Sequence, residues 1–104
     1  MPGLMVTQAQ CNQLGVEFAL TELDLAITFC QVGLTTRDFD RAERNVENAR
    51  VALQSVLHVK EHLSLDEQER KTVSAKTSQV AFLLVQLERR LVLSCKRKFE
   101  PTAR

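Results

Sequence analysis

The sequence contains little of the material from which turns, β-structure and disulfide frameworks are built. Its 104 residues include three Gly and two Pro, and both Pro lie near the ends, at Pro2 and Pro101. A β-sandwich or β-barrel needs a turn about every ten residues, so the chain is predicted to be all-α. Three Cys form an odd set without paired spacing, which argues against a disulfide framework and favours a reducing, cytoplasmic setting.

Aromatic side chains and net charge are also scarce. The chain has five Phe, no Tyr and no Trp, and 14 basic against 13 acidic residues leave a net charge of +1. The charge is unevenly placed, since residues 1–36 contain acidic residues but no Lys or Arg, whereas residues 88–104 are predominantly basic. We find no glycine-rich phosphate loop, nucleophile elbow or carboxylate pair. We therefore expect no enzyme, no cofactor and no small-molecule substrate.

Long apolar runs free of charge are absent as well. The most apolar stretch, residues 18–34, is interrupted by Glu22, Asp24 and Gln31. A membrane-spanning helix needs about twenty residues that are almost free of charge, and the first residues lack the basic segment of a secretory signal. We therefore expect no membrane span and a cytoplasmic protein.

Helical periodicity is present in three long segments. Each follows a capping pattern, in which two side chains three residues apart bond the free backbone N–H groups of a helix start. These patterns are Thr7-x-x-Gln10, Thr35-x-x-Asp38 and Ser64-x-x-Glu67. Gly33 is placed to end the first helix. The predicted helices span residues 7–33, 36–62 and 65–96 within one domain, 7–99, flanked by tails at 1–6 and 100–104. Short connections make neighbouring helices antiparallel, so we expect an up-down-up three-helix bundle.

The first and third helices carry more apolar surface than one core can cover. A core-facing stripe is predicted on each, at Leu20, Leu23, Ile27, Cys30 and Leu34 on the first and at Val80, Leu83, Leu84, Leu87 and Leu91 on the third. The surplus side chains are Phe18, Leu25, Phe29 and Val32 on the first helix and Phe82, Val85, Val92 and Leu93 on the third. A helix in a bundle buries a stripe only somewhat wider than about 100°.

An exposed apolar surface of this kind favours association. We expect a twofold homodimer with the first helix and the end of the third at its interface. A Glu in place of Phe29 is then expected to disrupt the assembly. Two alternatives are a kink near Gly15 that lets the bundle bury both faces, and a different protein as the partner.

His58 and His62 form the sequence H-x-x-E-H with Glu61 between them. In inverted zinc proteases this spacing presents two zinc ligands and a general base on one helix. Here the motif lies at the end of the predicted second helix, on its outer face, and no third ligand is evident. Two solvated His near a helix C-terminus, where the dipole favours a positive charge, explain the same residues. We therefore predict no metal site and keep His58 and His62 as the only candidate ligands.

The basic C-terminal segment is a candidate phosphate-binding site. Its residues are Arg89, Arg90, Lys96, Arg97 and Lys98. Modules that bind single-stranded nucleic acid add aromatic stacking platforms, and only Phe99 is present. Cations that suit a helix C-terminus explain the cluster equally, so a nucleic-acid-binding adaptor is the alternative function. Cys95 lies in this segment without a neighbouring His or second Cys, so no catalytic thiol is predicted.

Residues 26–53 resemble one repeat of the tetratricopeptide (TPR) family. The likeness rests on Phe29-Cys30 followed by Phe39-x-x-Ala42-x-x-x-Val46-x-x-Ala49. The sequence departs from the family at Ala26 and Gly33, where aromatic residues are usual, and a second repeat is missing. The resemblance implies a helical hairpin that binds proteins. We therefore expect a non-enzymatic helical protein that acts through protein–protein contact and self-association.

Overall fold

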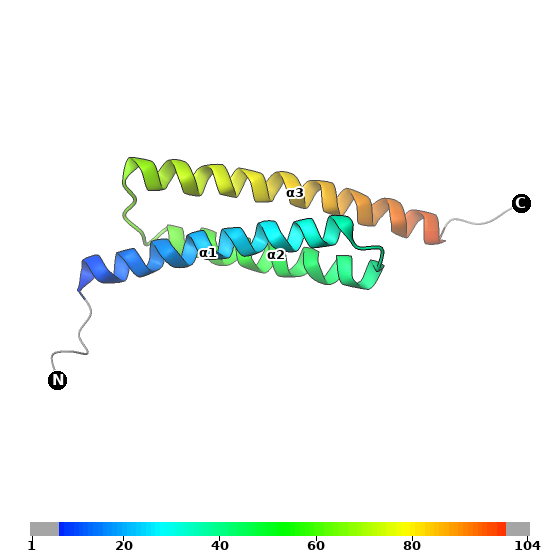
Figure 1. Ribbon diagram of the computed structural model, residues 1–104, viewed down its shortest axis with the longest axis horizontal. Coiled ribbons are helices and arrows are strands. Elements are labelled where there is room, and N and C mark those ends of the chain that lie inside the picture. Colours follow the sequence, from blue (N-terminus) through cyan, green and yellow to red (C-terminus); the bar gives the residue numbers. More distant parts are fainter. Residues whose placement is uncertain (1–6, 100–104) are drawn as a thin grey trace, which may run out of the picture.

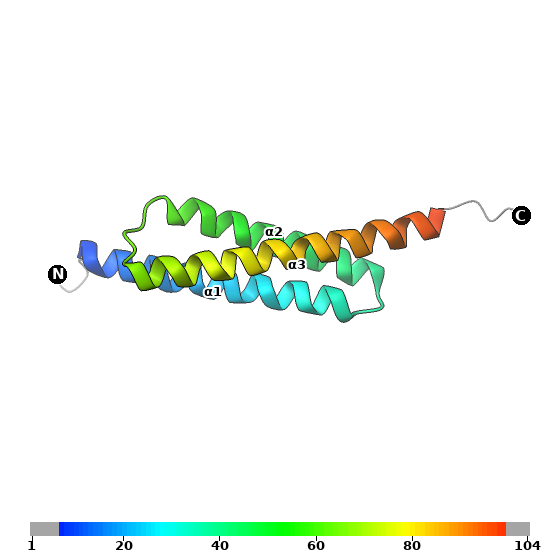
Figure 2. The ribbon, with the colours of Figure 1, turned by 90° about the horizontal axis from the view of Figure 1, so that it is seen from above.

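The computed structural model describes residues 7–99, with side chains described from 7 to 94, and shows three long helices packed side by side (Figure 1). α1 spans Gln8–Thr35, α2 spans Phe39–Lys60 and α3 spans Glu67–Phe99. Helices consecutive in the chain run antiparallel, and every pair of helices is in contact (Figures 1 and 2). The predicted all-α, up-down-up three-helix bundle is confirmed. The tails predicted at 1–6 and 100–104 lie outside the described residues.

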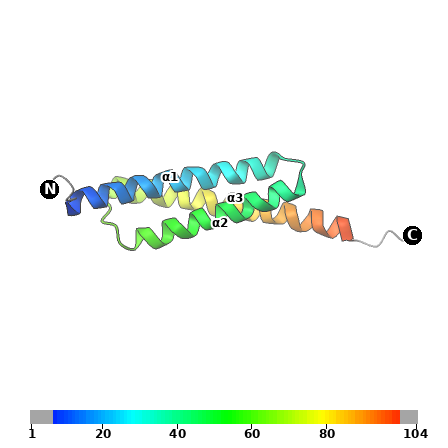
Figure 3. The ribbon, with the colours of Figure 1, turned by 90° about the horizontal axis from the view of Figure 1, so that it is seen from below.

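The helices are staggered along the bundle axis. α3 runs past the turn that joins α1 to α2, and the first turns of α1 extend beyond the start of α3 at the other end (Figure 3). Both regions therefore have fewer neighbours than the middle of the bundle. The closest association is between α1 and α2, while α3 rests on the pair.

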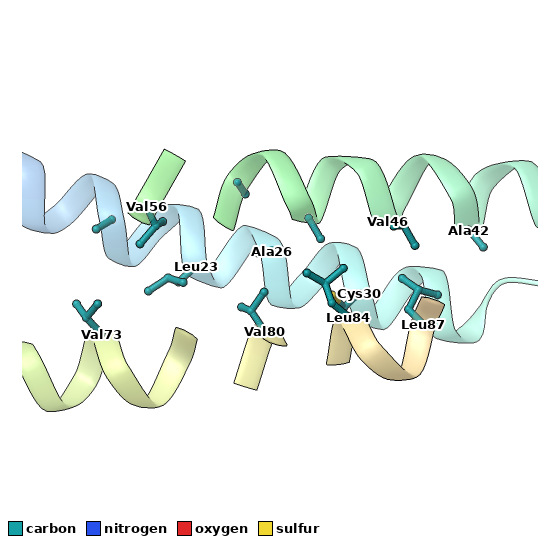
Figure 4. Close-up of a cluster of buried hydrophobic side chains, with 13 residues drawn as sticks. Leu23, Ala26, Cys30, Ala42, Val46, Val56, Val73, Val80, Leu84 and Leu87 are labelled. Atoms are coloured by element: carbon teal, nitrogen blue, oxygen red, sulfur yellow. The ribbon is translucent and has the colours of Figure 1, made fainter. Parts of the chain in front are cut away.

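One apolar core runs along the axis, and all three helices contribute to it (Figure 4). On α1 the buried positions recur at alternating spacings of three and four residues, the pattern of helices packed nearly parallel to one another, and the other two helices follow it less regularly. The buried residues are Val16, Ala19, Leu23, Ala26, Cys30 and Gly33 on α1, Ala42, Asn45, Val46, Ala49, Ala52 and Val56 on α2, and Val73, Val80, Leu84 and Leu87 on α3. Of the core side predicted on the third helix, Val80, Leu84 and Leu87 are buried, while Leu83 and Leu91 are half-buried against the core.

On α1 the core is displaced from the predicted face. Leu20, Ile27 and Leu34 were expected in the core but are half-buried at its edge, and Ala19 and Ala26 take the central positions instead. Ala19 and Ala26 of α1 share the core with a row of Ala residues on α2, and side chains this small allow two helix backbones to approach closely. Side-chain size, rather than hydrophobicity alone, therefore decides which side of α1 faces inward.

The predicted capping of α1 is confirmed at its N-terminus but not at its C-terminus. The capping box at Thr7 is present: the hydroxyl accepts from the Gln10 backbone N–H at 3.1 Å, and the Gln10 side chain accepts from the Thr7 N–H at 2.9 Å. The prediction that Gly33 ends the helix is wrong, because α1 continues to Thr35 and Gly33 is buried within it. A Cβ at Gly33 would lie 2.7 Å from Cδ2 of Leu87. This glycine is needed for close packing and not for a left-handed cap.

The turn between α2 and α3 also differs from the prediction. The capping box starts at Asp66 rather than Ser64: the Asp66 carboxylate accepts from the Glu69 N–H at 2.7 Å and the Glu69 carboxylate accepts from the Asp66 N–H at 3.0 Å. Ser64 instead bonds through its backbone to the Asn12 side chain, as donor at 2.7 Å and as acceptor at 2.9 Å. α2 ends at Lys60, two residues before the predicted end.

At the turn between α1 and α2, Asp38 rather than Thr35 is the capping residue of α2. Its carboxylate accepts from the backbone N–H groups of Asp40 at 3.0 Å and Arg41 at 3.3 Å. The predicted break lies at the observed turn, but α2 begins at Phe39, three residues later than expected.

Candidate interaction surface

The first apolar surface left over by the bundle lies on α1. Phe18, Leu25 and Val32 are each exposed, Phe18 to 43%, as the sequence predicted. Leu14, which the sequence analysis did not single out, extends the same side of the helix toward the N-terminus and is 60% exposed. We call these four residues the α1 stripe. Phe29 lies at its edge, half-buried against the core, so a charge there would damage the fold as well as any interface.

The second surface lies on the C-terminal half of α3 and is more exposed. Phe82 is 62% exposed and Val92 64%, and Val85 and Leu93 are also more than half exposed. We call these four residues the α3 stripe. Arg89 lies among them and is exposed. Among the described side chains it has no ion-pair partner, in contrast to Arg50, whose Nε donates to the Glu88 carboxylate at 3.0 Å.

The α1 stripe points away from α3. Asp24 marks the side of α1 turned to α3, because its carboxylate lies 2.6 Å from the Lys76 ammonium. Gly33, whose added Cβ would meet Leu87 of α3 at 2.7 Å and Asn45 of α2 at 3.4 Å, marks the inward side that faces both other helices. At 3.6 residues per turn, Leu25 lies about 100° beyond Asp24 and on the side opposite the core. The stripe therefore faces outward.

The α3 stripe faces outward on another side of the bundle. Arg90 reaches α1, where it donates to the carbonyl oxygens of Gly33 and Thr36, and Glu88 reaches Arg50 on α2. Residue 89 is rotated by about 100° from each of them, away from the core. The polar Asp24–Lys76 pair lies on the seam between the two helices. The two stripes are therefore separate surfaces.

A groove between α2 and α3 borders the α3 stripe. Its volume is about 480 Å³, and it has an apolar floor and a charged rim. The lining residues are Glu43, Arg44, Val46, Glu47, Arg50, Glu88, Leu91 and Val92. Val92 belongs to both the groove and the stripe, so a partner seated on α3 would also reach the groove.

The basic residues do not form one free cluster. Arg90 is half-buried, and its guanidinium satisfies carbonyl oxygens at the end of α1. Arg89 is exposed and belongs with the α3 stripe. The side chains of Lys96, Arg97 and Lys98, like that of Cys95, lie outside the described residues. Of the two arginines that can be placed, one has a structural role.

His58 and His62 lie together on the surface near the end of α2. Both are exposed, as predicted, and their ring centroids are 5.6 Å apart in an edge-on arrangement. They line a hollow of about 370 Å³ together with Cys11 and Asn12 of α1. The described residues contain no group of three or more metal-ligating side chains.

The Cys30 thiol is the one described group with a resolved change in acidity. Burial in the core, which disfavours the thiolate, and the negative charge of Glu88 raise the pKa of Cys30 from 9.0 to about 11. The thiol is therefore protonated at neutral pH. This agrees with the prediction of a small buried hydrophobe.

α1 meets the length and composition of a membrane span, with 28 residues and a mean hydropathy of 1.3 in its most apolar window. In this fold the same helix contributes six of the buried positions and packs against both other helices. Only 28% of that window is buried in the bundle, and the expectation that no membrane is involved stays a prediction.

No protein-family model matches this chain, and neither a curated protein nor a solved structure is significantly similar to it. The TPR resemblance of residues 26–53 accordingly stays a prediction.

Proposed function

We propose that this protein acts through protein–protein contact, without catalysis, and associates with itself through the outward apolar stripes of α1 and α3. The observation that carries the proposal is the α3 stripe, four large apolar side chains that are more than half exposed on a well-packed helix. Apolar surface of this kind is stabilised when a partner removes it from water, by about 25 cal/mol for each Å² buried.

The composition of the α3 stripe supports this role. Protein interfaces are enriched in aromatic residues and Arg and depleted in Lys and acidic residues. In the α3 stripe Phe82 is the aromatic residue and Arg89 lies beside it. The apolar residues Val85, Val92 and Leu93 surround them. The free thiols of Cys11 and Cys30 suit a protein of the reducing cytoplasm.

The test is the solution mass of the wild type beside two variants. In Phe82→Glu a charge enters the α3 stripe, and in the control Gln54→Glu the same charge enters the exposed polar face of α2. Size-exclusion chromatography with light scattering should give a mass above the monomer's 11.8 kDa for the wild type and the control, and 11.8 kDa for Phe82→Glu. Circular dichroism should show equal helicity in all three. An unchanged mass in Phe82→Glu contradicts the assignment of this surface.

A further inference from the structure

We infer that the self-association proposed above is heterologous: the α1 stripe of one copy packs on the α3 stripe of the next copy. This inference rests on the proposed function and specifies how the copies meet. It departs from the twofold dimer expected from the sequence, in which both stripes share one interface.

The placement of the stripes is the first argument. A twofold interface that contains both stripes requires them on one face of each copy. The contact between α1 of one copy and α3 of the other then occurs two times, once on each side of the axis. The structure has them on different sides, with the Asp24–Lys76 pair between. One flat contact between two copies therefore covers the α1 stripe or the α3 stripe of a given copy, but not both.

Charge decides which stripes meet. α1 contains Glu17, Glu22 and Asp24 and no Lys or Arg, and two of these carboxylates, Glu17 and Glu22, border its stripe. The α3 stripe instead surrounds the guanidinium of Arg89, which forms no ion pair with the described side chains. Packing α1 on α3 brings carboxylates toward this guanidinium, and complementary charges steer and orient association.

A contact between two α3 stripes, or between two α1 stripes, lacks this charge complementarity. Arg89 lies near the middle of the α3 stripe, between Phe82 and Leu93, so a twofold axis through that stripe would place two Arg89 side chains next to each other. Like charges across an interface cost free energy. A twofold contact between two α1 stripes would likewise bring carboxylates together, with no cation on either α1.

A heterologous contact leaves one stripe free at each end of every assembly. The next copy can add there, so association continues into a chain or closes into a ring. The wild type should therefore form species larger than dimers as its concentration rises.

Blocked variants test this arrangement. Phe18→Glu/Leu25→Glu blocks the α1 stripe, and Phe82→Glu/Val85→Glu blocks the α3 stripe. Each variant alone should be monomeric, and an equimolar mixture should form a heterodimer of twice the 11.8 kDa monomer mass and nothing larger. If the Glu substitutions lower the helicity of a variant, the mixing experiment is repeated with Gln at the same positions, which is a milder change.

The outcomes separate the inference from the proposed function. A blocked variant that dimerises by itself overturns the inference in favour of a twofold contact through its intact stripe. A mixture that stays monomeric, while the wild type associates, overturns it as well. A wild type that is monomeric at every concentration contradicts the proposed self-association itself. A different protein would then be the partner that covers the stripes.

A charge exchange gives an independent readout in the same heterodimer. Arg89→Glu, added to the variant with the blocked α1 stripe, should weaken the heterodimer about tenfold or more. Glu22→Arg, added to the other variant, should restore most of the loss, because the two charges exchange places. A loss that Glu22→Arg leaves uncorrected would contradict a contact in which the carboxylates beside the α1 stripe approach Arg89.

Discussion

At the scale of single residues, the positions without a side chain matter most to the packing of α1. Gly33 and Gly15 both lie within this helix, and neither has the positive φ angle that would require glycine. An added Cβ would lie 2.7 Å from Cδ2 of Leu87 at the first position and 2.4 Å from Cδ2 of Leu63 at the second. The two neighbours differ in their freedom to move, because Leu87 is fully buried and Leu63 is half-buried in the turn after α2.

Gly33→Ala should therefore destabilise the fold. Overpacking a buried site costs about 1–3 kcal/mol, and the gain of about 1 kcal/mol in helix propensity offsets only part of it. Chemical denaturation at low protein concentration, where association does not contribute, measures the effect.

Gly15→Ala is the matched control for that substitution. Leu63 can turn its side chain away, so the propensity gain of about 1 kcal/mol should leave stability unchanged or raised. Equal losses of stability in Gly33→Ala and Gly15→Ala would contradict the conclusion that Leu87 is held in place while Leu63 can move.

The buried thiol of Cys30 makes stability depend on alkaline pH. Well below pH 9 the thiol is protonated in both states, and its contribution to stability is fully present. Between 9 and about 11 it ionises in the unfolded chain only, because burial and Glu88 raise its pKa in the fold. The free energy of unfolding should fall over this range by about 2.5 kcal/mol from this group.

Cys30→Ala separates this effect from the titration of the Lys side chains, which the variant shares with the wild type. The variant is less stable at pH 8 because a buried side chain is shortened, but its stability should decline less between pH 8 and 11. Urea denaturation at the two pH values gives the comparison. Parallel declines in the wild type and the variant would show that Cys30 is not the titrating group.

At the scale of elements, the number and order of the helices follow from the sequence, while several of their ends do not. Capping patterns correctly mark the start of α1, but Ser64-x-x-Glu67 and Asp66-x-x-Glu69 fit the same pattern in one turn. A tertiary contact decides between them. Asn12 of α1 bonds the backbone of Ser64 on both sides and holds this residue outside the helix.

Replacement of the two candidate caps tests this reading. Asp66→Ala removes the side chain that accepts from the Glu69 N–H and should lower stability by about 1 kcal/mol. Ser64→Ala leaves the backbone bonds to Asn12 in place and should have little effect. Thermal unfolding followed by circular dichroism compares them, and a larger loss in Ser64→Ala would refute the assignment of the cap.

The face of α1 that enters the core shows a second limit of the sequence pattern. Apolar side chains surround most of this helix, so periodicity alone allows more than one inward face. Large residues such as Leu20 and Ile27 suggest one choice, but close approach to the Ala residues of α2 selects Ala19 and Ala26. That selection depends on the shape of the neighbouring helix, which the sequence of α1 does not contain.

At the scale of the whole molecule, the surplus of apolar surface could be read from the sequence and its arrangement could not. Seven of the eight side chains predicted for the interface are exposed, and Phe29 is the exception. The alternative in which a kink near Gly15 buries both faces does not hold, since α1 is helical through Gly15 and its outer stripe stays exposed. Whether two stripes share a face depends on how three helices rotate against one another.

The same rotation explains why Arg89 and Arg90, adjacent in sequence, have different environments. Arg90 turns inward to the carbonyl groups at the end of α1, while Arg89 turns outward into the α3 stripe. A basic pair that reads as one phosphate-binding feature is thus divided between the fold and the surface. The adaptor hypothesis loses Arg90, whose guanidinium is already engaged.

Sedimentation equilibrium of the wild type from micromolar to millimolar concentration tests most directly whether copies of this chain cover the exposed stripes. We predict an average mass that rises steadily above 11.8 kDa and passes the dimer value, since each added copy presents a new free stripe. A mass that stays at 11.8 kDa across the whole range would contradict the account.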